Sequence, residues 1–298
     1  MTDPAEADPH ASATERRDPE ADSAARLRDA GGAASAPQAR LARWLQETCG
    51  VIVGSERREA LASALREGAR GEDPAAFLRR LETAPEGDEA RARVLDAVLV
   101  HETKFYRAEA DLEALVRLLS RPRAAATASL RIWSAGCADG AEPYTLAMLL
   151  RHRIGALAAP GALEILGTDI SEPALARARG GRFDAYAFRD LPEEYRARCL
   201  SRAPDGSAAV APEIRACVRF EAHNLVRDRF PAPFDAIFCR NVTIYFDAAT
   251  QRRVVERFRL ALRPPGYLFL GSAGAMVDPP AGFDLLWVGP TAVFRPAE

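Results

Sequence analysis

The stretch Leu130–Leu149 constrains the fold of this chain more than any other segment. It reads LRIWSAGCADGAEPYTLAML. An apolar run ends in a loop with two glycines, Gly136 and Gly140, and a helical pattern follows at once, which predicts a strand, a tight turn and a helix. Glycines let a ligand approach the backbone closely, and the first N–H groups of a helix are free to bind it. The segment therefore predicts a ligand site at the carboxyl end of a strand.

The next apolar run, LEILGTD at 163–169, ends in a carboxylate, Asp169. A carboxylate at the tip of a second strand can accept hydrogen bonds from both hydroxyls of a ribose. The dinucleotide spacing G-x-G-x-x-G is absent from the preceding loop, and so is the phosphate-binding G-x-x-x-x-G-K-[ST]. We therefore expect S-adenosylmethionine as the cofactor; an ordinary strand–helix turn with a solvated aspartate is the alternative.

Alternation of strands and helices from about residue 128 predicts a parallel, doubly wound sheet. The final two strands are separated only by Gly289-Pro290, so we expect them to pair antiparallel. This combination resembles the seven-stranded Rossmann-like methyltransferase fold, an α/β sheet that is mainly parallel with its last strand antiparallel. The predicted strands are Leu130–Ala135, Glu164–Gly167, Val218–Ala222, Ala236–Cys239, Tyr267–Gly271, Leu285–Val288 and Ala292–Phe294, and the predicted helices are Glu142–His152, Glu172–Arg179 and Ala248–Leu262.

The chain is expected to divide into three regions, the last of which contains this sheet. Residues 2–38 contain one large apolar side chain, Leu27, and we predict a disordered tail over residues 1–38. Residues 39–102 carry leucines, valines and aromatic residues near helical spacing, which predicts a small N-terminal helical domain. Residues 103–298 would form the methyltransferase domain, with a short insert at about 182–217.

Four blocks of the sequence resemble the CheR-type protein-glutamate methyltransferases of bacterial chemotaxis. They occur in the order of that family, and the similarity extends over roughly residues 38–296. The last block is the most specific, because a strand that ends in CRN and runs into IYFD is uncommon elsewhere. The blocks are TKFYR at 103–107, IWSAGC at 132–137 with EPY at 142–144, HNL at 223–225, and FDAIFCRNVTIYFD at 234–247.

The resemblance implies that S-adenosylmethionine is converted to S-adenosylhomocysteine while glutamate side chains are esterified. The acceptor would be the cytoplasmic helical region of a methyl-accepting chemotaxis-type receptor, so the protein would act in signal transduction. A glutamate carboxylate already carries its lone pair and negative charge at neutral pH. The enzyme then needs to position and dehydrate the acceptor rather than to deprotonate it, which accounts for the absence of an evident catalytic triad.

The resemblance also implies roles for residues that contact the methionyl end of the cofactor. Arg107 would face the methionyl carboxylate, for which a guanidinium fork is well suited. Thr103 would donate a hydrogen bond to the cofactor, and Glu142 would bind the methionyl amino group. For Glu142 the alternative is an acid in the first helical turn, favoured by the helix dipole. His101 stands where many members have asparagine, and it can still form a hydrogen bond with the cofactor.

The remaining roles lie along the other strand ends. Asp169 would hold the ribose, and Asn224 and Leu225 resemble the pair that reads adenine. Arg240 and Asn241 would lie where the cofactor meets the substrate; a surface salt bridge is the alternative for Arg240. Tyr245, placed at the start of the next helix, would wall the acceptor channel, or pack in the core beside its neighbours. We therefore take Arg240 and Tyr245 as the candidate catalytic residues.

The substrate side is less determined by the sequence. Arg58, Arg66 and Arg70 of the helical region can present a basic face to an acidic receptor helix, although nearby glutamates make a mixed solvated face an equal alternative. Many family members have Ser-Glu after the strand that ends at Gly271, and this chain lacks that acid. The alternatives to the proposed activity are therefore a CheR-like methyltransferase with another acceptor, or a regulatory protein that binds the cofactor without turnover.

Composition excludes several other classes of function. The net charge of −2 gives no reason to expect nucleic acid or an anionic membrane as partner. No cysteine pair has C-x-x-C spacing and the four histidines are scattered, so we expect no metal site. Unclustered thiols, together with the lack of a membrane-spanning run or a signal-peptide core, indicate a cytoplasmic protein.

Overall fold

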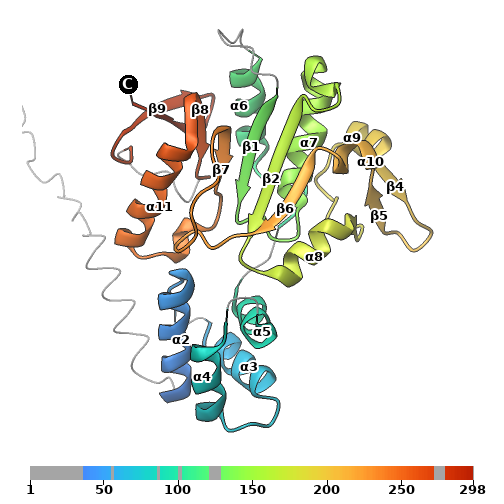
Figure 1. Cartoon of the computed structure of the whole chain (residues 1–298). Coiled ribbons are helices and arrows are strands. Elements are labelled where there is room, and N and C mark those ends of the chain that lie inside the picture. The colour runs from blue at the N-terminus through green and yellow to red at the C-terminus, as the bar shows by residue number, and fades with distance from the viewer. Residues whose placement is uncertain are drawn as a thin grey trace, which may run out of the picture.

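The computed structural model describes residues 36–54, 57–85, 88–99, 103–120, 129–271 and 279–297. Its centre is a seven-stranded sheet with the strand order β6-β2-β1-β7-β8-β10-β9 (Figure 1). The strands are β1 (Leu130–Ala135), β2 (Leu163–Asp169), β6 (Val218–Ala222), β7 (Phe234–Phe238), β8 (Leu262–Phe269), β9 (Phe283–Val288) and β10 (Thr291–Pro296).

The pairing of the strands confirms the predicted fold class. β1 pairs parallel with β2 and β7, β2 pairs parallel with β6, and β7 pairs parallel with β8. β10 pairs antiparallel with β9, as the Gly289-Pro290 turn predicted, and it also pairs antiparallel with β8. Because parallel strands end on the same edge, the segments that follow β1, β2, β6 and β7 meet at one edge of the sheet.

Side chains of β1 alternate between two apolar cores, which is the period of a strand covered on both faces. Ile132 packs in a core formed with helices α6 (Glu109–Leu119) and α7 (Ala141–Arg153). Trp133 packs in the opposite core, formed with α11 (Ala248–Ala261). Helix α8 (Glu172–Gly180) follows β2 and contacts β6. The sheet is thus held between helices on both faces.

Helix α6 was not among the predicted helices. Its leucines at 112, 115 and 119 follow the helical period and are buried, so the pattern that identifies the helix is present in the sequence. The helix places Asp111 beside the sheet, where that residue contributes to the site described below.

The N-terminal helical region consists of α2 (Ala36–Cys49), α3 (Arg58–Ala69), α4 (Pro74–Thr83) and α5 (Glu89–Val98). Helix α4 begins directly after Asp73, because the Asp73 carboxylate accepts a hydrogen bond from the Ala76 N–H and Pro74 occupies the first helical position. Figure 1 shows these helices beyond the edge of the sheet toward which β1 and β2 point. The predicted tail lies almost entirely outside the described residues.

Several contacts fasten this region to the sheet. Val51 forms an isolated antiparallel bridge with Phe246. On the opposite side, the Ser171 hydroxyl at the start of α8 donates a hydrogen bond of 2.8 Å to Asp96 of α5. The helical region is therefore attached at more than one point of the carboxyl edge.

The insert at about 182–217 forms a separate small sheet. Its antiparallel strands lie in the order β3-β5-β4, with bounds Arg182–Phe183, Ala208–Val210 and Leu200–Arg202 respectively. Two short helices, α9 (Glu193–Cys199) and α10 (Pro212–Arg215), complete it. Within the part of the chain that the structure describes, every helix is too short or too polar to cross a membrane.

Candidate functional site

A cavity of about 930 Å³, counting the space open to solvent, lies at the carboxyl edge of the sheet. It gathers every predicted site residue except His101, which lies outside the described residues. Those lining it are Thr103, Arg107, Gly136, Glu142, Asp169, Asn224, Leu225, Arg240, Asn241 and Tyr245.

The loop after β1 requires glycine at Gly136. This residue has a φ of +79°, and a Cβ atom there would lie 2.3 Å from Cγ2 of Val242. The N–H groups of Gly136 and Cys137 both donate to the Thr168 carbonyl, at 2.7 and 2.9 Å. The loop is thus drawn onto the end of β2, so that the backbone itself forms one wall of the cavity.

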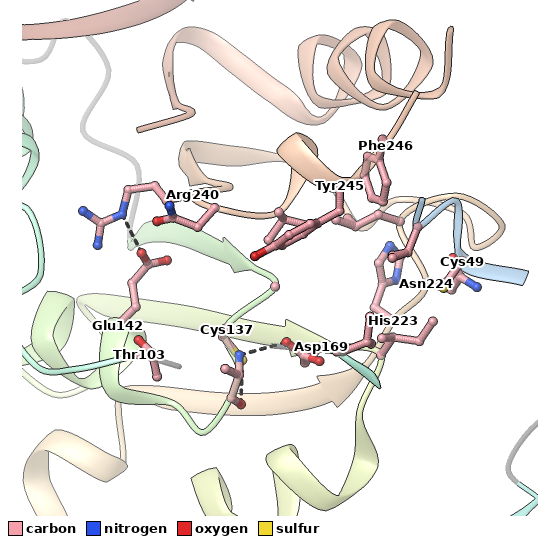
Figure 2. Close-up of a pocket in the computed structure, with 18 of the residues that line it drawn as sticks. Cys49, Thr103, Cys137, Glu142, Asp169, His223, Asn224, Arg240, Tyr245 and Phe246 are labelled. Atoms are coloured by element: carbon pink, nitrogen blue, oxygen red, sulfur yellow. Dashed lines mark hydrogen bonds and ion pairs between the residues drawn. The ribbon is translucent and has the colours of Figure 1, made fainter. Parts of the chain in front are cut away.

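Asp169 is held in place by the backbone around it. Its Oδ2 accepts a hydrogen bond from the Ala138 N–H at 2.8 Å, and its Oδ1 accepts one from the Ser171 N–H at 2.9 Å. The residue is buried and lines the cavity, as Figure 2 shows. A carboxylate has about four acceptor positions, so a residue of this type can accept hydrogen bonds from ligand hydroxyl groups as well as from the backbone. Two fixed hydrogen bonds therefore orient the carboxylate for such a ligand.

At one end of the cavity a buried ion pair joins Glu142 to Arg240 (Figure 2). Nε of Arg240 lies 2.7 Å from Oε2 of Glu142, and the Ser134 hydroxyl donates to Oε1 at 2.7 Å. We call Glu142 and Arg240 the charged end of the pocket. The Arg240 side chain is only 4% exposed, which excludes a surface salt bridge.

Asp111 of α6 is a second carboxylate on Arg240, and the sequence reasoning missed it. Its Oδ2 lies 3.3 Å from Nη1 of Arg240. Burial by itself lowers the pKa of the Arg240 guanidinium, but the charges and hydrogen bonds of Glu142 and Asp111 outweigh that effect and raise the pKa above its ordinary value. Arg240 is therefore a permanent buried cation held between two acids.

The loop that carries Thr103 and Arg107 is supported by the insert. The buried Phe105 ring packs against Phe183 and Phe188, with ring centroids 4.9 and 4.6 Å away. The Phe105 N–H also donates to the Ala187 carbonyl at 3.1 Å. Phe105 is thus structural, and its packing fixes the position of its pocket-lining neighbours.

Arg107 lies between two residues with left-handed backbone. Tyr106 and Ala108 have φ values of +60° and +54°, an uncommon conformation for residues other than glycine. The Arg107 carbonyl accepts a hydrogen bond of 2.9 Å from Nη1 of Arg240. The strained turn therefore couples the Thr103–Arg107 loop to the charged end.

At the other end of the cavity, Asn224 joins the sheet to the helical region. Its Nδ2 donates to the Thr48 carbonyl at 2.8 Å, and its Oδ1 accepts from the Val226 N–H at 3.0 Å. Cys49 and Phe246 lie beside it in Figure 2. We call Cys49, Asn224 and Phe246 the junction end of the pocket. The Asn224 amide thus shapes the wall through contacts within the protein.

The helical region supplies pocket residues that were not predicted from the sequence. Cys49, Val51 and Leu99 all line the cavity. In addition, the Ile52 N–H donates to the Tyr245 carbonyl at 2.8 Å. These are ordinary apolar or small side chains without a chemical pattern, so only the three-dimensional arrangement reveals them.

Tyr245 lines the cavity from a short 3₁₀ helix, Thr243–Tyr245, and not from the start of the next helix as the sequence indicated. Its ring is partly buried and is covered by the Arg57 guanidinium, 4.6 Å from the ring centroid. The neighbouring Ile244 is 40% exposed. Pure core packing therefore does not describe this segment, and Tyr245 is placed to wall the cavity.

The cysteines near the cavity are not activated. Burial, followed by the nearby charges of Asp169 and Glu142, raises the pKa of the Cys137 thiol well above its usual value. Burial likewise raises the pKa of the Cys239 thiol. Both remain protonated at neutral pH and act as small packing residues. The described ranges contain no group of three or more His, Cys, Asp or Glu side chains able to hold a metal ion.

The three arginines considered for the substrate side are not equivalent. Arg58 and Arg66 lie on α3, and Arg70 follows its last residue with a left-handed backbone. Arg66 is paired with Glu59 at 2.8 Å on an exposed surface. At Arg66 the surface of α3 therefore carries both a positive and a negative side chain rather than a purely basic face.

Comparison with known proteins shows which family this chain is similar to. Residues 101–287 match a family model described as the CheR methyltransferase, SAM binding domain. Chemotaxis protein methyltransferase 1 of Pseudomonas aeruginosa is 34% identical over 268 residues, which cover 85% of this chain and 94% of that protein. Chemotaxis protein methyltransferase of Escherichia coli strain K12 is 31% identical over 240 residues, which cover 78% of this chain and 82% of that protein.

Proposed function

The chain belongs to the CheR methyltransferase family, and from this premise we propose that it esterifies glutamate side chains on the cytoplasmic helical region of a chemotaxis-type receptor. It is an S-adenosylmethionine-dependent methyltransferase. The observation that carries the proposal is the convergence of Arg107, Glu142 and Asp169 on one cavity at the carboxyl edge of the sheet. The relatives named above are chemotaxis protein methyltransferases, which supports a receptor of that pathway as acceptor.

The residues present fit an adenosyl cofactor. Asp169 offers acceptor positions for ribose hydroxyls, and the apolar side chains of Leu225 and Phe246 suit the faces of a purine. Glu142 and Arg107 offer an anion and a cation, which match a methionyl ammonium and carboxylate respectively. Gly136 lets the backbone approach the ligand, because a side chain there would collide with Val242.

When bound, S-adenosylmethionine supplies a methyl group on a positively charged sulfur. The protein then has to hold a carboxylate oxygen in line with that methyl group and keep water away from it. In this proposal Tyr245 walls the path of the acceptor. Arg240 acts by positioning Glu142, because its guanidinium is engaged by Glu142 and Asp111. A general base is unnecessary for an acceptor that is already ionised.

The acceptor would approach past the N-terminal helical region. That region borders the cavity through Cys49, Val51 and Leu99. Arg57, stacked on Tyr245, gives this border a positive charge that suits an acidic helix. A receptor helix and the protein would meet in the cytoplasm, where such a receptor exposes its methylated region.

The acceptor chemistry is tested by transfer of radiolabelled methyl groups onto cytoplasmic fragments of receptors encoded in the same genome. The proposal predicts label that is released as methanol by mild base, since carboxylate methyl esters hydrolyse readily. Label that resists base would place the methyl group on nitrogen or carbon and overturn glutamate esterification.

The placement of the cofactor is tested separately by calorimetric titration with S-adenosylhomocysteine. Asp169→Ala and Arg107→Ala should each weaken binding by roughly tenfold or more, because each removes a charged partner of the ligand. The exposed, paired Arg66→Ala is the matched control and should bind like the wild type. Unchanged binding in both pocket variants would show that the ligand lies elsewhere.

A further inference from the structure

Asp111 lies behind the pocket rather than in its wall. Its side chain is 12% exposed and meets the Arg240 guanidinium, which is 4% exposed, at 3.3 Å. Glu142 lies on the same guanidinium at 2.7 Å, through a different nitrogen. Two acids thus share one arginine, and of these Glu142 lines the cavity whereas Asp111 does not.

The arrangement leaves an excess of negative charge on the pocket side. One guanidinium stands between two carboxylates, so with all three groups ionised the cluster carries one net negative charge. An uncompensated buried charge is costly unless a counter-ion binds. Of the two acids, Glu142 lines the cavity, so the position where a cation can be accepted lies beside Glu142.

We propose that Asp111 is a positioning residue that makes Glu142 available to the methionyl ammonium of the cofactor. By sharing the charge of Arg240, Asp111 prevents the Glu142–Arg240 pair from neutralising itself. The guanidinium also donates to the Arg107 carbonyl, so the same contact fixes the loop that faces the methionyl carboxylate. This inference rests on the proposed placement of the cofactor and is independent of the acceptor.

If Asp111 keeps Glu142 available to a cation, its removal should weaken the binding of ligands that carry an ammonium group and spare those that do not. S-adenosylhomocysteine carries the ammonium, whereas 5′-methylthioadenosine has the same nucleoside without it. Calorimetry on the full chain should show that Asp111→Asn lowers the affinity for S-adenosylhomocysteine by about tenfold, since interactions with charged groups contribute about that much. The affinity for 5′-methylthioadenosine should change by less than about twofold on the same reasoning. Asp111→Glu, which keeps the charge, should largely restore the selectivity.

Two comparisons separate this role from a structural one. Asp235→Asn removes another buried acid, which pairs with Arg263 at 3.6 Å at the opposite end of the sheet, and it should leave the ratio of the two affinities unchanged. Glu142→Gln should show the same selective loss as Asp111→Asn. If the asparagine variant does not fold, Asp111→Leu fills the space without charge and serves the same test.

The outcomes are distinct. Equal losses for the two ligands in Asp111→Asn, with a selective loss in Glu142→Gln, would overturn the role of Asp111 while leaving the cofactor placement intact. Equal losses in both variants would overturn that placement as well.

Discussion

The two ends of the pocket are built on different physical principles. At the charged end, Glu142 and Arg240 are buried ions whose positions are set by mutual attraction and by Asp111. At the junction end, Asn224 and Phe246 are placed by hydrogen bonds to the backbone of the helical region, through Thr48 and the Val51 bridge. Changes at the charged end should therefore act through electrostatics, whereas changes at the junction end should act through the fit between two parts of the chain.

The largest expected effect comes from removing the central cation. Arg240→Met leaves Glu142 and Asp111 buried without a counter-ion, which should lower the free energy of unfolding by about 3–5 kcal/mol. Urea denaturation measures this loss. Arg66→Met, which breaks an exposed pair, should cost no more than about 1 kcal/mol. A comparable small loss for Arg240→Met would mean that the charged end is not organised by this ion.

An intermediate effect is expected at the junction end. Asn224→Ala removes the hydrogen bonds to Thr48 and Val226, and should lower the free energy of unfolding by about 1–2 kcal/mol. Because this end faces the nucleoside in our proposal, S-adenosylhomocysteine and 5′-methylthioadenosine should lose affinity to the same extent. A loss confined to S-adenosylhomocysteine would contradict the contrast between the two ends.

The smallest effect concerns His223, whose ring packs edge-on against Trp133 and Phe230. Burial lowers the pKa of its imidazole, despite the opposing charges of Asp228 and Glu221. The unfolded chain then binds the proton more readily, so stability is present above pH about 6.5 and falls as the pH drops toward the lowered pKa.

The corresponding variant is His223→Gln, which stays neutral throughout. Its stability should decline less steeply than that of the wild type below pH 6.5, by at most about 1.4 kcal/mol per pH unit. Urea midpoints between pH 5 and 8 provide the comparison. Parallel curves for the two proteins would show that this histidine does not contribute to the acid sensitivity.

The sheet could be predicted from the sequence because its strands are short apolar runs between turn residues. The bounds of β1 and β6 agree with the prediction, and the other strands extend beyond it by one to five residues at one or both ends. β7 and β8 also end earlier than predicted, by one and two residues respectively. These extensions include polar residues or prolines, as in the first half of β8. Such residues do not predict a strand by themselves, and they are part of one because a neighbouring strand pairs with them. Helix α6 was missed although its periodicity is present.

The site was predictable where a residue type has its own chemical signature. Asp169 and Gly136 follow from strand ends and turn geometry, and Glu142 and Arg107 from the resemblance to a family. Asp111 and Val51 could not be selected in this way, because each acts through a partner far away in the chain. The residue roles themselves stay predictions until the ligand-binding measurements are made.

The bridge between Val51 and Phe246 has a consequence for any attempt to trim the protein. The stretch recognised as the SAM binding domain, residues 101–287, retains the strands from β1 to β8 but excludes Cys49, Val51 and Leu99. A version reduced to that stretch would open one side of the cavity to water. The catalytic unit is therefore larger than the domain by which the family is recognised, and one residue of the junction end, Cys49, is supplied from outside it.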